Sequence, residues 1–130
     1  MSGLIYLATP FTDKDLAIME NRFNVVNKVA SDLMKKGIHV FSPISHCYPI
    51  ALAGGLPKTW EFWEAYDRVM LKASAKLIVL MQDGWRESLG VTGEIRIANE
   101  LGIPVEYMNP KTQIISSDYR MVLEESNSAL

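Results

Sequence analysis

Two acidic residues lie on helix faces that are otherwise apolar, a position suited to acid–base or nucleophilic chemistry. Asp67 follows Trp63 by four residues and precedes Leu71 by four, so it shares their face of a predicted helix. Burial raises the pKa of a carboxylate, as a general acid requires. The alternative is that Asp67 pairs with Arg68 at the helix edge and has no chemical role.

Glu94 shares a face with Val91 and Ala98 and is expected in the first turn of another helix. The helix macrodipole stabilises negative charge there, so an ionised Glu94 would be a competent nucleophile. The same placement also suits a glutamate that only caps the helix. The small residues of 87–93, with the hydroxyl of Ser88, would let backbone N–H groups approach an anion, although they match no established phosphate-binding motif.

Strands and helices are predicted to alternate along the chain and so to position these side chains. We expect strands over 4–8, 38–42, 76–81 and 103–107, and helices from Thr12 or Asp13 to 36, over 60–74 and over 90–101. Residues 43–58, with three prolines and Gly54-Gly55, are interpreted as a long loop, and 111–130 as a tail with a short strand or helix.

This order predicts an α/β fold with a mostly parallel sheet of Rossmann-like or flavodoxin-like type. We expect one domain over 1–130, a three-layer sandwich with its core in 4–107 and a C-terminal tail over 111–130. Ligands bind such sheets beyond the carboxyl ends of the strands.

The composition narrows the classes of partner. The chain has 130 residues and a net charge of −2, without the clustered cations that polymeric nucleic acids require. No apolar run approaches the roughly 20 residues that cross a membrane. A single cysteine, Cys47, precludes an intrachain disulfide, and we expect a cytoplasmic protein. With two histidines and one cysteine there is no zinc pattern, and we expect neither metal nor cofactor.

Taken in order, residues 4–106 resemble the nucleoside 2-deoxyribosyltransferase superfamily, in a small uncharacterised branch. That superfamily includes the nucleoside 5′-monophosphate N-glycosidases. The resemblance rests on Ile5-Tyr6-Leu7-Ala8, Phe11-Thr12-Asp13, Ser88-Leu89-Gly90-Val91-Thr92-Gly93-Glu94 and Leu101-Gly102-Ile103-Pro104-Val105.

The resemblance implies cleavage of an N-glycosidic bond, by hydrolysis or by 2′-deoxyribosyl transfer to a second base. Glu94 would attack C1′ to form a covalent glycosyl-enzyme, Asp67 would protonate the departing base, and Tyr6 would orient Glu94. Ser88, six residues before Glu94, corresponds to a serine in the monophosphate hydrolases and to an aspartate in the nucleoside transferases. Because a carboxylate would repel a phosphate, Ser88 favours a 5′-monophosphate.

Further residues are expected to contact the substrate, with aromatic rings stacking on the base. They are Gly90, Thr9, Phe11, His46 and Trp63. The first loop departs from the glycine-rich loop of the superfamily, and its aromatic neighbours would equally suit a core. The superfamily also implies a homodimer or higher homo-oligomer.

Two other functions stay open. Residues 90–94 also resemble the Gly-Thr-x-x-Glu of cytokinin-type phosphoribohydrolases. Alternatively, the chain is a non-catalytic Rossmann-like module that binds a nucleotide. Carboxyl groups of Asp67 and Glu94 more than about 9 Å apart would favour that module, because they would be too distant for glycosidic cleavage.

Overall fold

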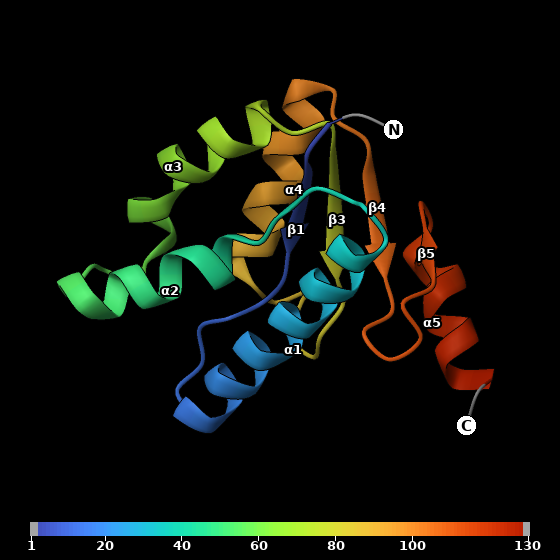
Figure 1. Cartoon of the computed structure of the whole chain (residues 1–130), viewed down its shortest axis with the longest axis horizontal. Helices are drawn as coiled ribbons and strands as arrows, with labels where there is room; N and C mark the ends of the chain where they lie inside the picture. Colours follow the sequence, from blue (N-terminus) through green and yellow to red (C-terminus); the bar gives the residue numbers. More distant parts are fainter. Residues whose placement is uncertain (1–2, 129–130) are drawn as a thin grey trace.

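A computed structural model describes residues 3–128, with side chains described through Leu123. Its five strands form one sheet in the order β2-β1-β3-β4-β5 (Figure 1). They are β1 (Ile5–Ala8), β2 (Val40–Phe41), β3 (Lys76–Leu80), β4 (Val105–Met108) and β5 (Ile115–Ser116). The first four pair in parallel and β5 joins β4 antiparallel, so the prediction of a mostly parallel sheet is confirmed.

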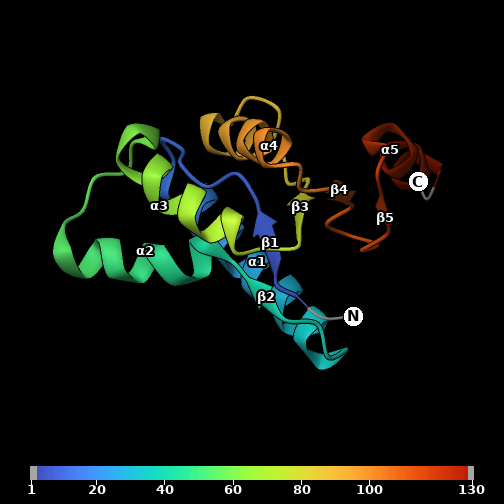
Figure 2. The same cartoon turned by 90° about the horizontal axis from the view of Figure 1, so that it is seen from above.

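Helices cover both faces of this sheet. They are α1 (Leu16–Lys35), α2 (Pro43–Gly54), α3 (Trp60–Lys72), α4 (Leu89–Leu101) and α5 (Tyr119–Ser128). Seen from above, α1 lies on one face and α3 and α4 on the other (Figure 2). Strand β1 is buried on both sides, with Ile5 and Leu7 packing among the residues of α1, and Tyr6 and Ala8 among those of α3 and α4. This explains why its sequence is apolar at successive positions.

The prediction of a loop over 43–58 is wrong in its first part, because α2 occupies residues 43–54. The Ser42 side chain accepts a hydrogen bond from the Ser45 backbone amide as the N-cap, and Pro43 takes a position at which a helix needs no N–H donor. Gly55, with φ 64°, ends the helix in the left-handed conformation. Pro43, one of the three prolines that suggested a loop, thus lies at the start of a helix.

Two other boundaries differ from the prediction. Helix α1 begins at Leu16, and its N-cap is Asp15, whose carboxylate accepts from the Ala17 amide, rather than Thr12 or Asp13. The tail contains both a strand, β5, and a helix, α5, so its predicted fragment is two elements. No helix in residues 3–128 is long and apolar enough to cross a membrane.

Candidate active site

The predicted catalytic residues converge where the strand order reverses, between β1 and β3. Such a switch point opens a crevice at the carboxyl ends of the strands, because the connections leave in opposite directions. Strand β1 carries Tyr6, α3 carries Asp67 and α4 carries Glu94. Three elements distant in the sequence therefore bring three titratable side chains together.

Tyr6 and Glu94 form a buried hydrogen-bonded pair. The Tyr6 hydroxyl donates to Oε2 of Glu94, and the two residues are 0% and 5% exposed. Burial, followed by the charges of Glu94 and Asp67, holds the pKa of Tyr6 well above its ordinary value. Tyr6 therefore keeps its proton and serves as a fixed donor to the carboxyl group.

Asp67 completes this cluster and is also buried, at 7% exposed. Burial raises its pKa to about 6, while hydrogen bonding to Glu94 and Tyr6 acts in the opposite direction. The pKa of Glu94 is raised well above its ordinary value, first by burial and then by the charge of Asp67. Two carboxyl groups that interact this directly in a buried site hold one proton between them near neutral pH.

The expected position of Glu94 in the first turn of its helix is wrong. Helix α4 begins at Leu89, so Glu94 is its sixth residue and its first turn contains no acidic residue. The helix macrodipole acts mainly within the first turn, and it contributes little to ionising Glu94. The hydrogen bond from Tyr6 is the interaction that favours the ionised form, because it lowers the pKa of Glu94.

Close packing between α3 and α4 fixes the two carboxyl groups. Gly93 lies directly beside the indole of Trp60, and a Cβ at Gly93 would meet ring carbon Cζ2 at 2.3 Å. A side chain there would push the helices apart. Gly93 thus sets the separation of the helices that carry Asp67 and Glu94.

A cavity of about 680 Å³ opens beside this cluster. Its walls include seven of the predicted site residues: Thr9, Phe11, Trp63, Asp67, Ser88, Gly90 and Glu94. Tyr6 does not line the cavity, but its hydroxyl donates to Glu94, which does. The Thr9 hydroxyl is already engaged, donating to the Leu80 carbonyl and accepting from the Gln82 amide, so it joins β1 to β3.

Ser88 is the N-cap of α4 and lies at the cavity wall with Gly90. Its Oγ accepts from the Val91 amide at 3.1 Å, which leaves the hydroxyl proton available to a ligand. The start of α4 offers backbone N–H groups to an anion. Glu87 lines the same cavity and opposes an anion there.

His46 does not line this cavity. It is exposed on α2, packs its ring 5.9 Å from that of Phe41, and borders a second cavity of about 270 Å³. Trp63 borders both cavities, and its Nε1 donates to the Pro57 carbonyl. The structure therefore separates His46 from the other predicted substrate contacts.

Sequence reasoning missed several cavity residues. Tyr48 and Cys47 come from α2, the helix interpreted as loop, and Tyr48 packs 4.5 Å from the ring of Phe11. Burial, with the charge of Asp67, raises the pKa of the Cys47 thiol to about 11, so the thiol is neutral. Arg22 also lines the cavity, and no sequence pattern had distinguished it from a solvated arginine.

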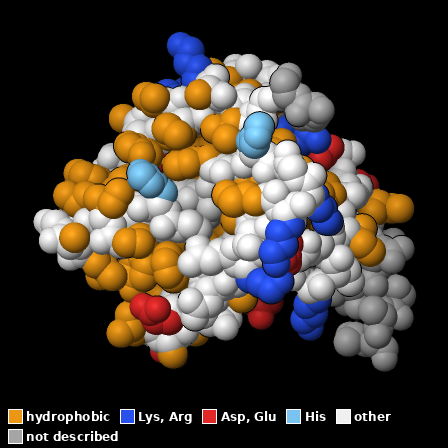
Figure 3. Space-filling view, viewed as in Figure 1, with side chains coloured by type: hydrophobic (Ala, Val, Ile, Leu, Met, Phe, Trp, Pro, Cys, Tyr) orange, Lys and Arg blue, Asp and Glu red, His pale blue; other side chains and the backbone are white. Residues whose placement is uncertain are grey.

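Exposed apolar side chains gather over α2 and α3 (Figure 3). Those at least two-fifths exposed on these helices are Ile50, Leu52, Phe62 and Val69.

Within the part of the chain that the structure describes, no three histidine, cysteine or acidic side chains are grouped as a metal ion would require.

The fold is a mixed α/β fold similar to that of a nucleoside deoxyribosyltransferase. It resembles a solved structure of the 2-deoxyribosyltransferase of Bacillus psychrosaccharolyticus, with a TM-score of 0.56 and 24% identity, covering 93% of this chain and 80% of that one. Residues 3–110 match the family model described as a domain of unknown function, DUF1937, and the chain belongs to that family. No curated protein matches the sequence.

Proposed function

We propose that this chain cleaves the N-glycosidic bond of a nucleoside or nucleoside 5′-monophosphate through a covalent intermediate on Glu94. The observation that carries the proposal is the buried cluster of Tyr6, Asp67 and Glu94 at the wall of a 680 Å³ cavity. The chemistry needs one carboxylate and one carboxylic acid side by side, and this pair shares a proton. The fold of a 2-deoxyribosyltransferase is consistent with that chemistry.

In the first step, a carboxylate oxygen of Glu94 attacks C1′ of the sugar. The C1′–N bond breaks, its electron pair goes to the base, and Asp67 gives the base a proton. In the second step, water or a second base attacks C1′ and transfers a proton to Asp67, and Glu94 leaves as a carboxylate. Two displacements at one carbon give net retention.

The direct interaction of the two carboxyl groups supports this order of steps. Retaining enzymes hold their carboxyl groups about 5 Å apart, whereas inverting enzymes leave about 6.5–9.5 Å for a water molecule. Asp67 and Glu94 lie in one buried cluster, and each shifts the pKa of the other. Tyr6 donates to Glu94 and lowers its pKa, which favours the ionised Glu94 that attack on C1′ requires.

A 5′-monophosphate is the substrate we favour. Ser88 and Gly90 line the cavity, where the Ser88 hydroxyl proton and the amides at the start of α4 can donate to a phosphate. Lys58 adds a cation to the lining, while Glu87 and Glu61 weaken the attraction. Whether the sugar passes to water or to a second base is decided by competition between them.

The test is chromatography of bases released from ribo- and deoxyribonucleosides and their 5′-monophosphates, with and without a second free base. Wild type should release or exchange a base, and Glu94→Gln should lose at least about a thousandfold in kcat, because the nucleophile is gone. Glu100→Gln, on the exposed face of the same helix, is the matched control. Nucleotide binding without any turnover would favour the non-catalytic binding module instead.

We also propose that the apolar surface over α2 and α3, which contains Phe62 and Val69, joins copies of the chain. Both residues lie on α3, seven positions apart and so on one face of the helix, and their side chains are 45% and 67% exposed. Light scattering should give at least a dimer, and Val69→Asp should reduce it to a monomer. A monomeric wild type would remove the basis for this assembly.

A further inference from the structure

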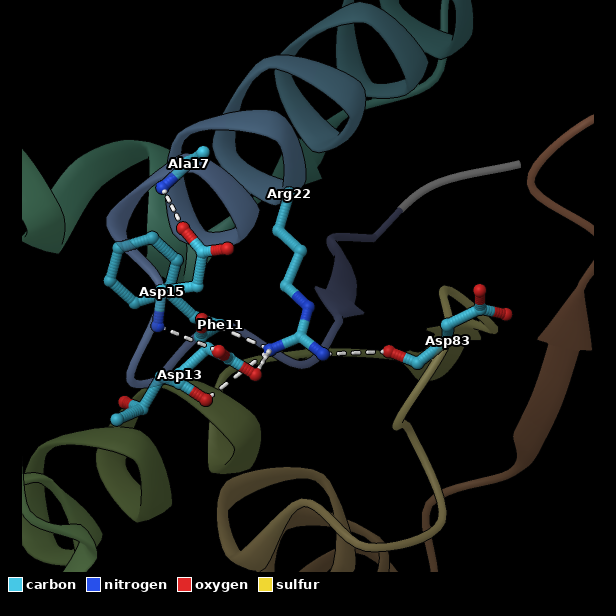
Figure 4. A network of polar contacts seen from close by, with 7 residues as sticks. Phe11, Asp13, Asp15, Ala17, Arg22 and Asp83 are labelled. Atoms are coloured by element: carbon cyan, nitrogen blue, oxygen red, sulfur yellow. Dashed lines mark hydrogen bonds and ion pairs between the residues drawn. The ribbon is translucent and has the colours of Figure 1, made fainter.

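Arg22 of α1 joins the two loops that frame the opening of the switch point (Figure 4). Its Nη1 donates to the Phe11 and Thr12 carbonyls, each at 3.2 Å, and its Nη2 donates to the Asp83 carbonyl at 2.8 Å. Residues 11 and 12 belong to the loop after β1, and residue 83 to the loop after β3. One guanidinium group therefore spans the crevice.

Arg22 is held mainly by peptide carbonyls and not by a close ion pair. Its side chain is 12% exposed, and its carboxylate partner, Asp13, lies 3.9 Å away. The planar fork of a guanidinium reaches acceptors in different directions, which an ammonium group on a flexible stem does not reproduce. The contacts thus depend on the shape of arginine more than on its charge.

The loop after β3 is adapted to this contact. Gly84 has φ +91°, and a Cβ there would lie 2.7 Å from Nη2 of Arg22. Such a Cβ would force the guanidinium to shift, and Nη2 is the atom that bonds to the Asp83 carbonyl. The Gln82 amide also donates to the Arg22 carbonyl, at 3.2 Å, which ties the end of β3 to the same turn of α1.

The two loops that Arg22 holds contribute residues to the wall of the cavity. Phe11 contributes its ring, and the loop after β3 continues to Ser88, the N-cap of α4. Tyr6, Asp67 and Glu94 are instead held by β1, α3 and α4 and do not contact Arg22. Loss of Arg22 would therefore displace substrate contacts and leave the reacting carboxyl groups in place.

We propose that Arg22 is a positioning residue that clamps the loops after β1 and β3 and so shapes the substrate cavity. Its effect on turnover rests on the proposed function, whereas its effect on the loops does not. The competing role is direct recognition of a substrate anion by the same guanidinium group. The two roles differ in what Arg22→Lys does, since lysine keeps the charge and loses the fork.

The first measurement is amide hydrogen exchange by NMR. The amides of Trp85 and Glu87 bond to carbonyls of the loop after β3, and the Asp15 amide bonds to the Asp13 carboxylate in the other loop. Arg22→Gln and Arg22→Lys should each speed exchange of these amides by about tenfold or more. Lys28→Gln, an exposed cation on the same helix, should leave them unchanged.

Gly84→Ala is the second variant, because its Cβ displaces the guanidinium while Arg22 stays in the chain. Alanine is also strained at φ +91°, so Gly84→Ala in the Arg22→Gln background measures the effect of that strain alone. It should loosen the Trp85 and Glu87 amides as Arg22→Gln does. Wild-type exchange in both Arg22 variants, or in Gly84→Ala, would overturn the clamp. This result decides the proposal even if the wild type turns over no nucleoside.

Steady-state kinetics then separates the clamp from an anion contact. A clamp predicts a rise in KM of about 10- to 100-fold for nucleosides and 5′-monophosphates alike in Arg22→Lys, with kcat changed less. The pH profile of kcat should not move, because Asp67 and Glu94 keep their surroundings. A loss confined to 5′-monophosphates, rescued by Arg22→Lys, would overturn the positioning role.

Discussion

Gly93→Ala tests whether close packing of α3 on α4 builds the site. In an exposed helix interior, replacing glycine by alanine stabilises a protein by about 1 kcal/mol. At Gly93 the added Cβ would meet three carbons of the Trp60 ring at 2.3, 2.6 and 2.9 Å. Overpacking typically costs about 1–3 kcal/mol, and contacts with three ring atoms place this site at the upper end. We therefore expect a net loss of about 1–2 kcal/mol.

Urea unfolding followed by circular dichroism measures this change. Gly90→Ala is the control on the same helix, because its added Cβ would meet only the Ser88 Oγ at 3.8 Å. It should be neutral or stabilising. In Trp60→Leu the ring is gone, so Gly93→Ala should cost much less there, giving a coupling energy of about 1–2 kcal/mol.

The same substitution should also lower activity, since it separates Asp67 from Glu94. A displacement near 1 Å can cost about a hundredfold in rate, so kcat should fall more than the loss of folded protein explains. If Gly93→Ala raised the urea midpoint as an ordinary helix substitution does, the packing argument for this site would be refuted.

Three further substitutions address the cluster and the cavity. Tyr6→Phe removes the hydrogen bond that lowers the pKa of Glu94, so this pKa should rise further. The acid limb of the kcat profile should then shift to higher pH, and kcat should fall about 10- to 100-fold. An acid limb that does not move would contradict this reasoning. Asp67→Asn should raise the urea midpoint relative to wild type at pH 8 and not near pH 4. Burial raises the pKa of Asp67 in the folded protein to about 6, so the folded protein holds this proton more tightly than the unfolded chain does. The stability of the wild type therefore declines as pH rises through this range, and asparagine removes that loss. Equal midpoint differences at both pH values would refute that reasoning. Ser88→Gly should raise KM for 5′-monophosphates alone, because glycine at an N-cap costs only a few tenths of a kcal/mol and α4 stays intact; an equal rise for nucleosides would remove Ser88 from phosphate recognition.

The periodicity of the sequence was enough to predict the sheet and the faces of α3 and α4. Strand β1 is apolar at every position because it lies between two layers, and Asp67 is recognisable because it interrupts an apolar stripe. The first-turn placement of Glu94 failed because the residue is fifth from the predicted helix start and sixth from the observed one, whereas a turn holds about 3.6 residues. The macrodipole acts over one turn, so the electrostatic argument for an ionised Glu94 does not hold.

Neither helix α2 nor the contacts of Arg22 could be predicted from the sequence, and the reason differs between the two. Prolines mark both loops and helix starts, and only the observed capping by Ser42 separates the two. Arg22 binds peptide carbonyls, among them one of Asp83, 61 positions away, and a carbonyl has no side-chain identity that a pattern could reveal. His46 has the residue type of a substrate contact, but α2 turns it toward another cavity.

The two sides of the candidate site come from different layers of the molecule. The carboxyl groups of Asp67 and Glu94 come from helices on one face of the sheet, which meet without a gap at Gly93. The opposite wall comes from the other side of the crevice, where Tyr48 of α2 supports Phe11 and Arg22 of α1 fixes the loops. Because the switch point separates these two sets, a change in the wall that contains Phe11 would leave the buried carboxyl groups in place. Under the proposed function, the proton shared by Asp67 and Glu94 would set the pH dependence, and the loops held by Arg22 would set the choice of substrate.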